Sequence, residues 1–354
     1  MITIRGFGSK RVGKLLAIAG FSLGFSLSSL AATAEIEANK MAVTRLIHAM
    51  GIPAEFSGVA LEVFAENDKQ LRNEFENLVY NAKDPVLSEL ALPPYEAITN
   101  RTNTITRILG EGNMVAASIR VQGTHSGNLY GIPATGKTFD IESAAVFKLA
   151  NRRIVEAWYM ADEATLLRQL DVRLPVRQDG LINLPPGRGD VGTFDDALAE
   201  HMTNPVDTPE YRHSKLLLAY KSENKPVGYN FPDRPYSKLL RSSMEKINKR
   251  GAELGFEGNH NASMSGKHEL LGNFMSEGDL AMFKFRLSAV NSSLLYSVSA
   301  SGNTLNNWKL GFAEFDGDSW TNAWFMADEL GFLLAIGNQE ATEFLVGDIG
   351  KIYP

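Results

Sequence analysis

The sequence has no cysteine among its 354 residues. Disulfides, thiolate zinc sites and thiol nucleophiles are therefore excluded. The histidines lack the H-x-x-x-H spacing of paired metal ligands, and no G-x-S-x-G elbow is present. We therefore expect neither a metal site nor covalent acyl catalysis.

Acidic residues are missing from positions 1–34, which carry Arg5, Lys10, Arg11 and Lys14. An apolar stretch follows at 15–30 and ends at Ala32-Thr33-Ala34. A basic start, an apolar core and a small-x-small site are typical of a secretory signal peptide, with an uncleaved membrane anchor as the alternative. Export without cysteines predicts a bacterial periplasmic protein.

The rest of the chain has no uninterrupted apolar run long enough to span a bilayer, so no membrane contact is expected after cleavage. The formal net charge is −6, and removal of residues 1–34 would make it more negative. An acidic protein repels phosphate backbones, so nucleic acid is not an expected partner. The length suits two domains.

Residues 131–138 read GIPATGKT and match the G-x-x-x-x-G-K-T pattern of a P-loop. A P-loop needs a helix directly after the lysine, because its N-terminus helps to bind the phosphates. Here the residues after Lys137 alternate like a strand, and the corresponding loop of an internal repeat lacks the lysine. We therefore interpret GIPATGKT as a strand-joining loop and expect no bound nucleotide.

That repeat has an offset of 166 residues. AWYMADE at 157–163 returns as AWFMADE at 323–329, and residues 108–170 align with 274–336 without a gap. Alternating apolar residues at 115–121 and 281–287 predict strands with one buried face. Asp316-Gly317-Asp318 and Ala150-Asn151-Arg152 predict hairpin turns. Helices are expected at the ranges 36–49, 68–81, 162–170, 238–250 and 328–336.

The first copy carries motifs in a fixed order: GTHSGNLYGIPATGK at 123–137, RIVEAW at 153–158, Asp162, and LLRQL at 166–170. This order resembles the SnoaL-like polyketide cyclase family. The resemblance implies an α+β fold with cone-shaped, nuclear-transport-factor-2-like (NTF2-like) domains, in which a curved antiparallel sheet wraps a few helices. It also implies cofactor-free acid/base chemistry in an apolar pocket.

The two copies differ at this motif. Ala134 stands where the family usually has a second proline, and Asn291 replaces His125 in the second copy. We therefore expect two tandem domains, the second degenerate, which could pack as an intramolecular pseudo-dimer. The expected bounds are 1–34 for the signal peptide, 35–172 for domain 1, 173–204 for a Pro/Gly-rich linker, 205–345 for domain 2 and 346–354 for a tail.

Candidate site residues lie near the motif. If RIVEAWYMAD is one strand, Glu156, Trp158, Met160 and Asp162 share a face, which makes Glu156, Trp158 and Met160 candidate substrate-binding residues of a pocket. Burial beside Trp and Met would suit Asp162 to general acid/base catalysis, whereas its place before a helix would equally suit an N-cap. His125 could polarise a carbonyl or simply hydrogen-bond across a hairpin.

The remaining candidates are Tyr130 as a pocket residue and, in the second copy, Trp324 and Asp328 as counterparts of Trp158 and Asp162. The tryptophans suit a core or a pocket wall. Three functions stay open: a cyclase- or isomerase-like enzyme for a small apolar carbonyl compound, a binding module for such a molecule, and an assembly module without a pocket.

Overall fold

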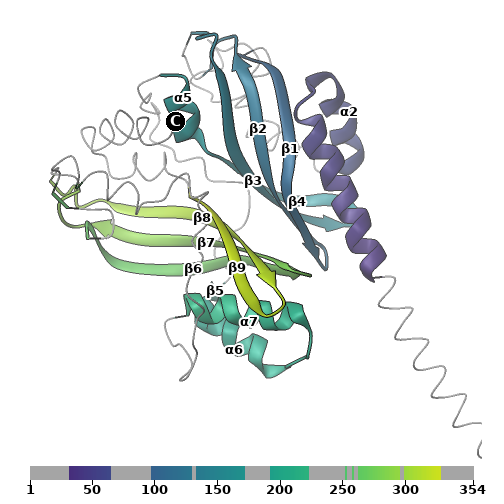
Figure 1. The fold of residues 1–354 in the computed structure, drawn as a ribbon, viewed down its shortest axis with the longest axis vertical. Helices are drawn as coiled ribbons and strands as arrows, with labels where there is room; N and C mark the ends of the chain where they lie inside the picture. Colours follow the sequence, from purple (N-terminus) through teal and green to yellow (C-terminus); the bar gives the residue numbers. More distant parts are fainter. Residues whose placement is uncertain are drawn as a thin grey trace, which may run out of the picture.

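The computed structural model describes residues 32–64, 97–129, 133–171, 192–222, 252, 257–258, 262–295 and 299–327. A helix covers residues 32–49, which confirms the helix expected at 36–49. Antiparallel strands and short helices make up the rest of the described chain (Figure 1). Their bounds are α2 Pro53–Val63, β1 Ile98–Glu111, β2 Met114–His125, β3 Thr138–Ala150, β4 Arg153–Ala161, α5 Glu163–Gln169, β5 Gly192–Thr193, α6 Phe194–Thr203, α7 Pro209–Lys221, β6 Met264–Glu277, β7 Leu280–Asn291, β8 Thr304–Asp316 and β9 Ser319–Ala327.

The first sheet is an antiparallel meander in the order β1-β2-β3-β4. Its inner face packs against the helix at 32–49 and against α2, which together form one buried cluster with the sheet. Strand β2 supplies Val115, Ala117, Ile119 and Val121 to this cluster. Because side chains alternate along a strand, these residues define the inner face of the sheet. The alternation predicted at 115–121 is thus confirmed.

The second sheet has the order β5-β6-β7-β8-β9 and is also antiparallel. Helices α6 and α7 cover its inner face, where Phe194 and Leu217 meet Phe283, Phe285 and other aromatic residues. Figure 1 shows both helices on the side of this sheet that is turned away from the first sheet. The arrangement of two antiparallel sheets with a few helices is α+β, as expected.

The two sheets match strand by strand at a constant offset. Strand β6 begins at Met264, 166 residues after β1 begins at Ile98, and the other three pairs of strands keep the same offset at both ends. The irregularity in register at Lys148 and Leu149 likewise returns at Glu314 and Phe315. Bulges are specific backbone features, so their recurrence shows that the two sheets have the same local geometry.

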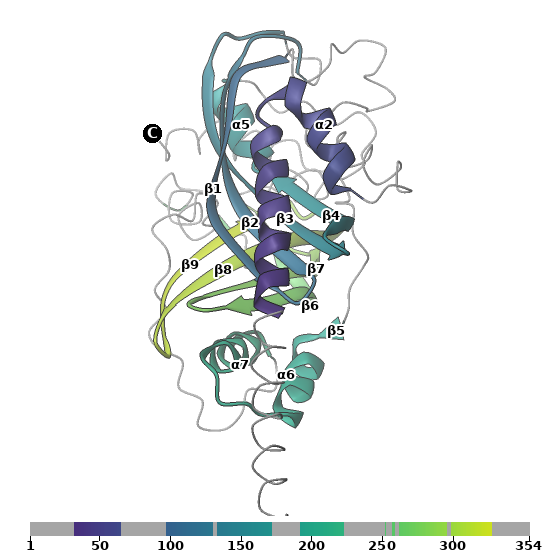
Figure 2. The same cartoon turned by 90° about the vertical axis from the view of Figure 1, so that its right-hand side faces the viewer.

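The outer faces of the sheets pack against each other and form a third buried cluster, which we call the inter-sheet core. It contains residues from both sheets and excludes those of the inner faces. Figure 2 shows the second sheet lying across the first. Both faces of each sheet are therefore covered. The members of the inter-sheet core are Leu109, Ala116, Ala144, Val146, Trp158, Met160, Met275, Met282, Trp308, Leu310, Phe312, Trp324 and Met326.

Hydrogen bonds at the rim of the inter-sheet core are reciprocal. The carboxylate of Glu277 accepts from the backbone N–H of Gly110 at 2.8 Å, and that of Glu111 accepts from Ser276 N–H at 2.7 Å. Each acceptor and donor is the partner of the other at the 166-residue offset. Residue i contacting j while j contacts i is the pattern of a two-fold interface.

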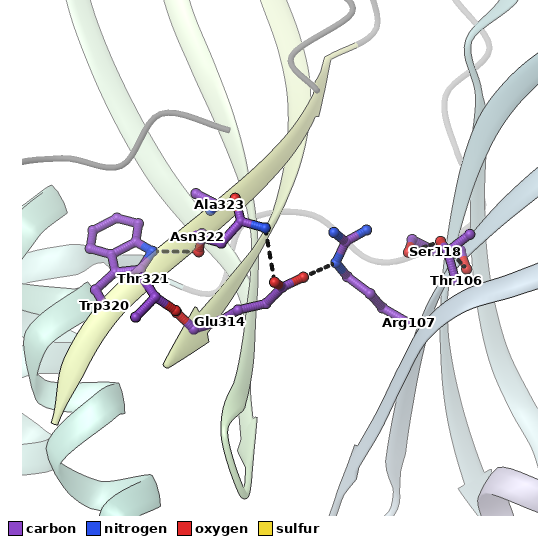
Figure 3. Close-up of polar contacts among 8 residues, drawn as sticks. All are labelled: Thr106, Arg107, Ser118, Glu314, Trp320, Thr321, Asn322 and Ala323. Carbon is purple, nitrogen blue, oxygen red and sulfur yellow. Dashed lines mark hydrogen bonds and ion pairs between the residues drawn. The ribbon is translucent and has the colours of Figure 1, made fainter. Parts of the chain in front are cut away.

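A polar contact at the same interface is not reciprocal. Arg107 Nε of β1 donates to Glu314 Oε1 of β8 at 2.6 Å, and Asn322 Nδ2 of β9 donates to the other carboxylate oxygen at 2.8 Å (Figure 3). Burial would raise the pKa of Glu314, but these hydrogen bonds outweigh it and hold the pKa below its usual range. Position 148, which matches Glu314, carries a lysine instead.

The structure corrects the boundary of the expected linker. Residues 192–203 of the range 173–204 form β5 and α6 rather than a linker. Thr193 caps α6, because its side chain accepts from Asp196 N–H at 3.0 Å and donates to the Asp196 carboxylate at 2.8 Å. Thr193 is thus the N-cap of α6, and Asp196 is its N3 residue. Helix α2 and helix α7 were not predicted.

Several expectations fall on residues outside the described ones. They are the signal segment up to residue 31, the helices at 68–81, 238–250 and 328–336, most of the linker, and the tail at 346–354. The helix expected at 162–170 is confirmed as α5. Within the described residues, no helix combines the length and the hydropathy that a membrane span requires.

Candidate functional site

His125 is the last residue of β2 and lies on the inner face of the first sheet. The pairing of β2 with β3 is regular from Met114 to Thr124, so the phase set by Val115 and Val121 continues to His125. Its side chain is fully buried. The backbone of His125 also closes the loop that follows, because its N–H donates to Lys137 O and its carbonyl accepts from Gly136 N–H.

Thr135 fixes the state of the His125 ring. The Thr135 backbone N–H donates to His125 Nδ1 at 3.3 Å, and the Thr135 hydroxyl lies 3.0 Å from the same nitrogen. Because a backbone N–H can only donate, Nδ1 must be the unprotonated nitrogen. The neutral ring then carries its proton on Nε2.

The Nε2 atom is buried and has no hydrogen-bond partner among the described residues. Burial lowers the pKa of His125, and an interaction of the ring with the Gly127 backbone, which falls outside hydrogen-bond geometry, partly offsets this shift. A neutral imidazole with a free N–H, held in a buried position, can donate a hydrogen bond to an oxygen of a bound molecule.

Gly123 precedes His125 on the same face and leaves room for neighbouring apolar side chains. A Cβ at this position would lie 2.6 Å from Ile98 Cγ2 and 2.9 Å from the Phe139 ring. The glycine of Gly-Thr-His therefore allows Phe139, its partner on β3, to pack over this position. The second copy has Ala289 here and the smaller Leu305 in place of Phe139.

Asn291 occupies the place of His125 in the second sheet. Its Oδ1 accepts from the Ser301 backbone N–H at 2.7 Å, just as His125 Nδ1 accepts from Thr135. Its Nδ2 donates to Ser263 O at 3.3 Å. Both ends of the amide are thus used within the protein. The unpartnered donor is therefore found at His125 and not at Asn291.

The loop after His125 lacks the context of a P-loop. Lys137 is followed by β3, a strand, as the alternation predicted. The Lys137 ammonium pairs with the exposed carboxylate of Asp171. The missed residue of this loop is Thr135, whose role could have been suspected from its match with Ser301, a second hydroxyl residue at the repeat offset.

Asp162 caps α5. Its Oδ1 accepts from Thr165 N–H at 3.0 Å, and its Oδ2 accepts from the Thr165 hydroxyl at 2.7 Å. The side chain is buried, with 7% exposure. The capping role that the sequence left open is therefore present, and both oxygens serve it.

Glu156, Trp158 and Met160 lie on a different face from His125. Trp158 and Met160 belong to the inter-sheet core, whereas Ala157 and Tyr159 contact the helices on the inner face. The alternation itself is as expected, but it turns these side chains toward the second sheet instead of a pocket. Glu156 is partly exposed and pairs with Lys148, its neighbour across β3 and β4, at 3.2 Å.

Trp324 of β9 matches Trp158 at the 166-residue offset and also lies in the inter-sheet core. Tyr130 and Asp328 lie outside the described residues. No group of metal-ligating side chains occurs in the part of the chain that the structure describes.

His125 and Asp162 sit at different levels of the first sheet. The backbone N–H of His125 donates to the carbonyl of Lys137, directly before β3. The backbone N–H of Asp162 donates to the carbonyl of Glu142, which is on β3. Five residues of extended chain correspond to roughly 17 Å. A direct histidine–aspartate pair is therefore not formed, and both groups could act on one molecule only if it reaches between these levels.

The comparisons with known proteins agree with the motif order. The family model of the SnoaL-like polyketide cyclases matches residues 95–170, which include β1 to β4 and α5. No curated protein matches the chain.

Solved structures resemble about two fifths of the chain. A proposed SnoaL-like polyketide cyclase from Jannaschia sp. CCS1 is 18% identical, with 38% of this chain and 92% of that chain covered and a TM-score of 0.31. IdmH from Streptomyces antibioticus, a proposed polyketide cyclase, is 21% identical over 38% of this chain and 99% of its own, with a TM-score of 0.29. AclR from Streptomyces galilaeus, a proposed hydroxylase, is 18% identical over 40% and 84%, with a TM-score of 0.32.

Proposed function

We propose that the first sheet and its helices form a SnoaL-like domain that binds a small apolar carbonyl compound and promotes cofactor-independent acid/base chemistry on it. Enolisation, with an aldol-type ring closure or an isomerisation as the outcome, is the reaction class. The proposal depends mainly on one observation, the buried and unpartnered Nε2–H of His125.

The surroundings of His125 suit an apolar ligand. The inner face of the sheet is lined by aliphatic and aromatic side chains such as Val121, Phe139 and Ile141. A carbonyl oxygen in this environment would lose its hydrogen bonds to water. A donor at Nε2 would replace them, and it would bind more strongly as negative charge develops on the oxygen.

Asp162 is the proposed proton shuttle. A carboxylate can take the proton from the carbon next to the carbonyl while His125 stabilises the enolate oxygen. For this role the ligand must extend from the level of His125 to the start of α5. The alternative is a module that binds the same compound through His125 without turnover, or that serves assembly alone.

The tandem arrangement belongs to the same proposal. The matched strand bounds and bulges support two copies of one domain, and the reciprocal contacts of Glu111 and Glu277 support their packing as an intramolecular pseudo-dimer. Export to a bacterial periplasm through residues 1–34 remains part of the proposal, with its support in the sequence alone.

The experiment uses β-tetralone, an apolar ketone, in D₂O and follows deuterium uptake at the carbons next to the carbonyl by proton NMR. We expect the protein to accelerate exchange above the buffer rate. His125→Asn should reduce this acceleration by about 100-fold, because removal of one such donor costs on the order of 10²–10³ in rate. The variant should still fold, because Asn291 accepts the corresponding hydrogen bond from the Ser301 backbone N–H in the second sheet.

Asp162→Asn separates the enzyme from the binding module. Asparagine caps a helix as well as aspartate does, but it cannot take up the proton. Loss of exchange with unchanged thermal stability would support the proton shuttle. If the wild-type protein binds β-tetralone in a calorimeter but exchanges no deuterium, the binding alternative holds. Unchanged binding in His125→Asn would contradict both.

A further inference from the structure

The second sheet carries a cluster of charged groups on its inner face, and the first sheet has the uncharged Ser143 and Asn103 at the positions that match Lys309 and Glu269. Lys309 of β8 pairs in register with Phe285 of β7, a member of the buried cluster under α6 and α7. Residues directly opposite each other in antiparallel strands point to the same face. Lys309 therefore lies on the covered inner face, and the matching residue of the first sheet is Ser143.

Two further charges reach the same place from other elements. Lys221, the last residue of α7, holds its ammonium 4.2 Å from the centre of the Phe285 ring, and Lys309 holds its own 6.0 Å from that centre. Glu269 of β6 pairs with Lys221 through both carboxylate oxygens, at 2.8 and 3.1 Å. Lys267, also on β6, adds positive charge at the exposed edge.

Among the residues that the structure describes, the charges of this cluster do not balance. The single carboxylate of the cluster is committed to Lys221, and Lys309 forms no ion pair or hydrogen bond with any residue that the structure describes. Burial lowers the pKa of Lys309 to about 8, and repulsion from Lys221 adds to the shift. An excess of positive charge inside an acidic protein, where the formal net charge is −6, is costly unless an anion compensates it.

The walls around the cluster are aromatic. Phe283 stacks on Phe285 with ring centres 5.4 Å apart, and Phe194 of α6 meets Phe285 edge-on at 6.0 Å. An occupant must therefore present a negative group to the lysines and an apolar body to these rings. A free inorganic anion would satisfy only the first condition.

We propose that the inner face of the second sheet binds an apolar carboxylate, with Lys309 and Lys221 at its carboxylate group and Phe285 beside its apolar part. This site is separate from that of His125, and it lies in the half of the chain that has Asn291 at the matching position. The two proposals can therefore fail independently.

The test compares two probes of the same shape, 2-naphthoate and 2-naphthylmethanol, by isothermal titration calorimetry at pH 7. We expect the protein to bind 2-naphthoate at least tenfold more tightly than the alcohol. Lys309→Met keeps the length of the side chain and removes the charge, so it should abolish this preference. Lys137→Met, on the exposed loop of the first sheet, makes the same charge change and should leave both affinities unchanged.

Chemical labelling gives a second readout that needs no variant. Acetic anhydride modifies neutral amines, so Lys309 should be acetylated at pH 8 and protected by 2-naphthoate, as read by mass spectrometry of the digested protein. Equal affinity for the two probes, or absent binding of both, would overturn the proposal. So would unchanged naphthoate binding in Lys309→Met, or acetylation of Lys309 that 2-naphthoate does not slow.

Discussion

His125 and Asn291 occupy matching positions of the two sheets. The side chain of His125 has a buried nitrogen without a hydrogen-bond partner, whereas both polar atoms of the Asn291 amide have one. Both accept a hydrogen bond from the backbone of the residue ten positions later. Asn291 Nδ2 also donates to the Ser263 carbonyl, whereas His125 Nε2 has no hydrogen-bond partner among the described residues. A buried donor without a partner costs stability, which is expected where function requires it.

The histidine should make the stability of the protein depend on pH. Because burial lowers its pKa, the unfolded chain binds a proton at His125 below about pH 6.5 while the folded protein does not. The free energy of unfolding should therefore fall as the pH drops from that value toward the folded-state pKa. His125→Asn should remove this part of the acid sensitivity.

Urea unfolding at pH 7.5 and pH 5 measures the effect, since the difference between the two values should shrink in His125→Asn. His268→Asn is the matched control, because His268 lies exposed on β6. An acid sensitivity that both variants retain in full would show that other groups cause it.

Asp162 can be assigned by comparing two substitutions. Asp162→Ala removes both hydrogen bonds to Thr165 and should lower the free energy of unfolding by about 1 kcal/mol, the usual cost of a lost N-cap. Asp162→Asn should cost a few tenths at most. Thr193→Ala removes the N-cap of α6, which packs on the second sheet, and should lower the free energy of unfolding by a similar amount.

Urea denaturation of the three variants gives the measurement. Equal losses in Asp162→Ala and Asp162→Asn would mean that the negative charge, and not the cap, stabilises this position. Such a result would also weaken Asp162→Asn as a test of catalysis, because the variant would no longer be structurally neutral.

At the scale of elements, sequence patterns located the strands well but could not assign their faces. Alternation at 115–121, the hairpin turns and the repeat offset predicted β2, β7 and their neighbours, and the helix expected at 162–170 is α5. Trp158 and Met160 were assigned to a pocket because a strand with one buried face was assumed. In the protein both faces are buried, one by helices and one by the other sheet. Local alternation cannot distinguish two apolar faces.

Helix α6 was missed for a different physical reason. Its first turn follows a stretch dense in Pro and Gly, which indicates a linker, and its apolar residues are few. The start signal was nevertheless present as Thr193 followed by Asp196. Thr135 was missed because a hydroxyl in a loop becomes informative only when the fold places it beside His125.

At the scale of the whole molecule, the inter-sheet core should make the chain unfold as one unit. The outer faces contribute large side chains from both sheets, among them Phe312, which is fully buried and lies against Trp324 with ring centres 5.6 Å apart. An interface of this kind resembles a domain core, and neither outer face would be stable in water alone. We therefore expect a single thermal transition.

Phe312→Ala tests that coupling. Truncation of a buried Phe costs about 3–5 kcal/mol through lost contacts and the cavity left behind. Since Phe312 lies between the sheets, amide hydrogen exchange should accelerate in β2 and β3 as well as in β7 and β8. Met202→Ala, at an exposed position of α6, should leave exchange unchanged in both. Acceleration confined to β6–β9, or a second thermal transition, would show that the halves are independent, and the reciprocal hydrogen bonds of Glu111 and Glu277 would then join two domains that fold separately.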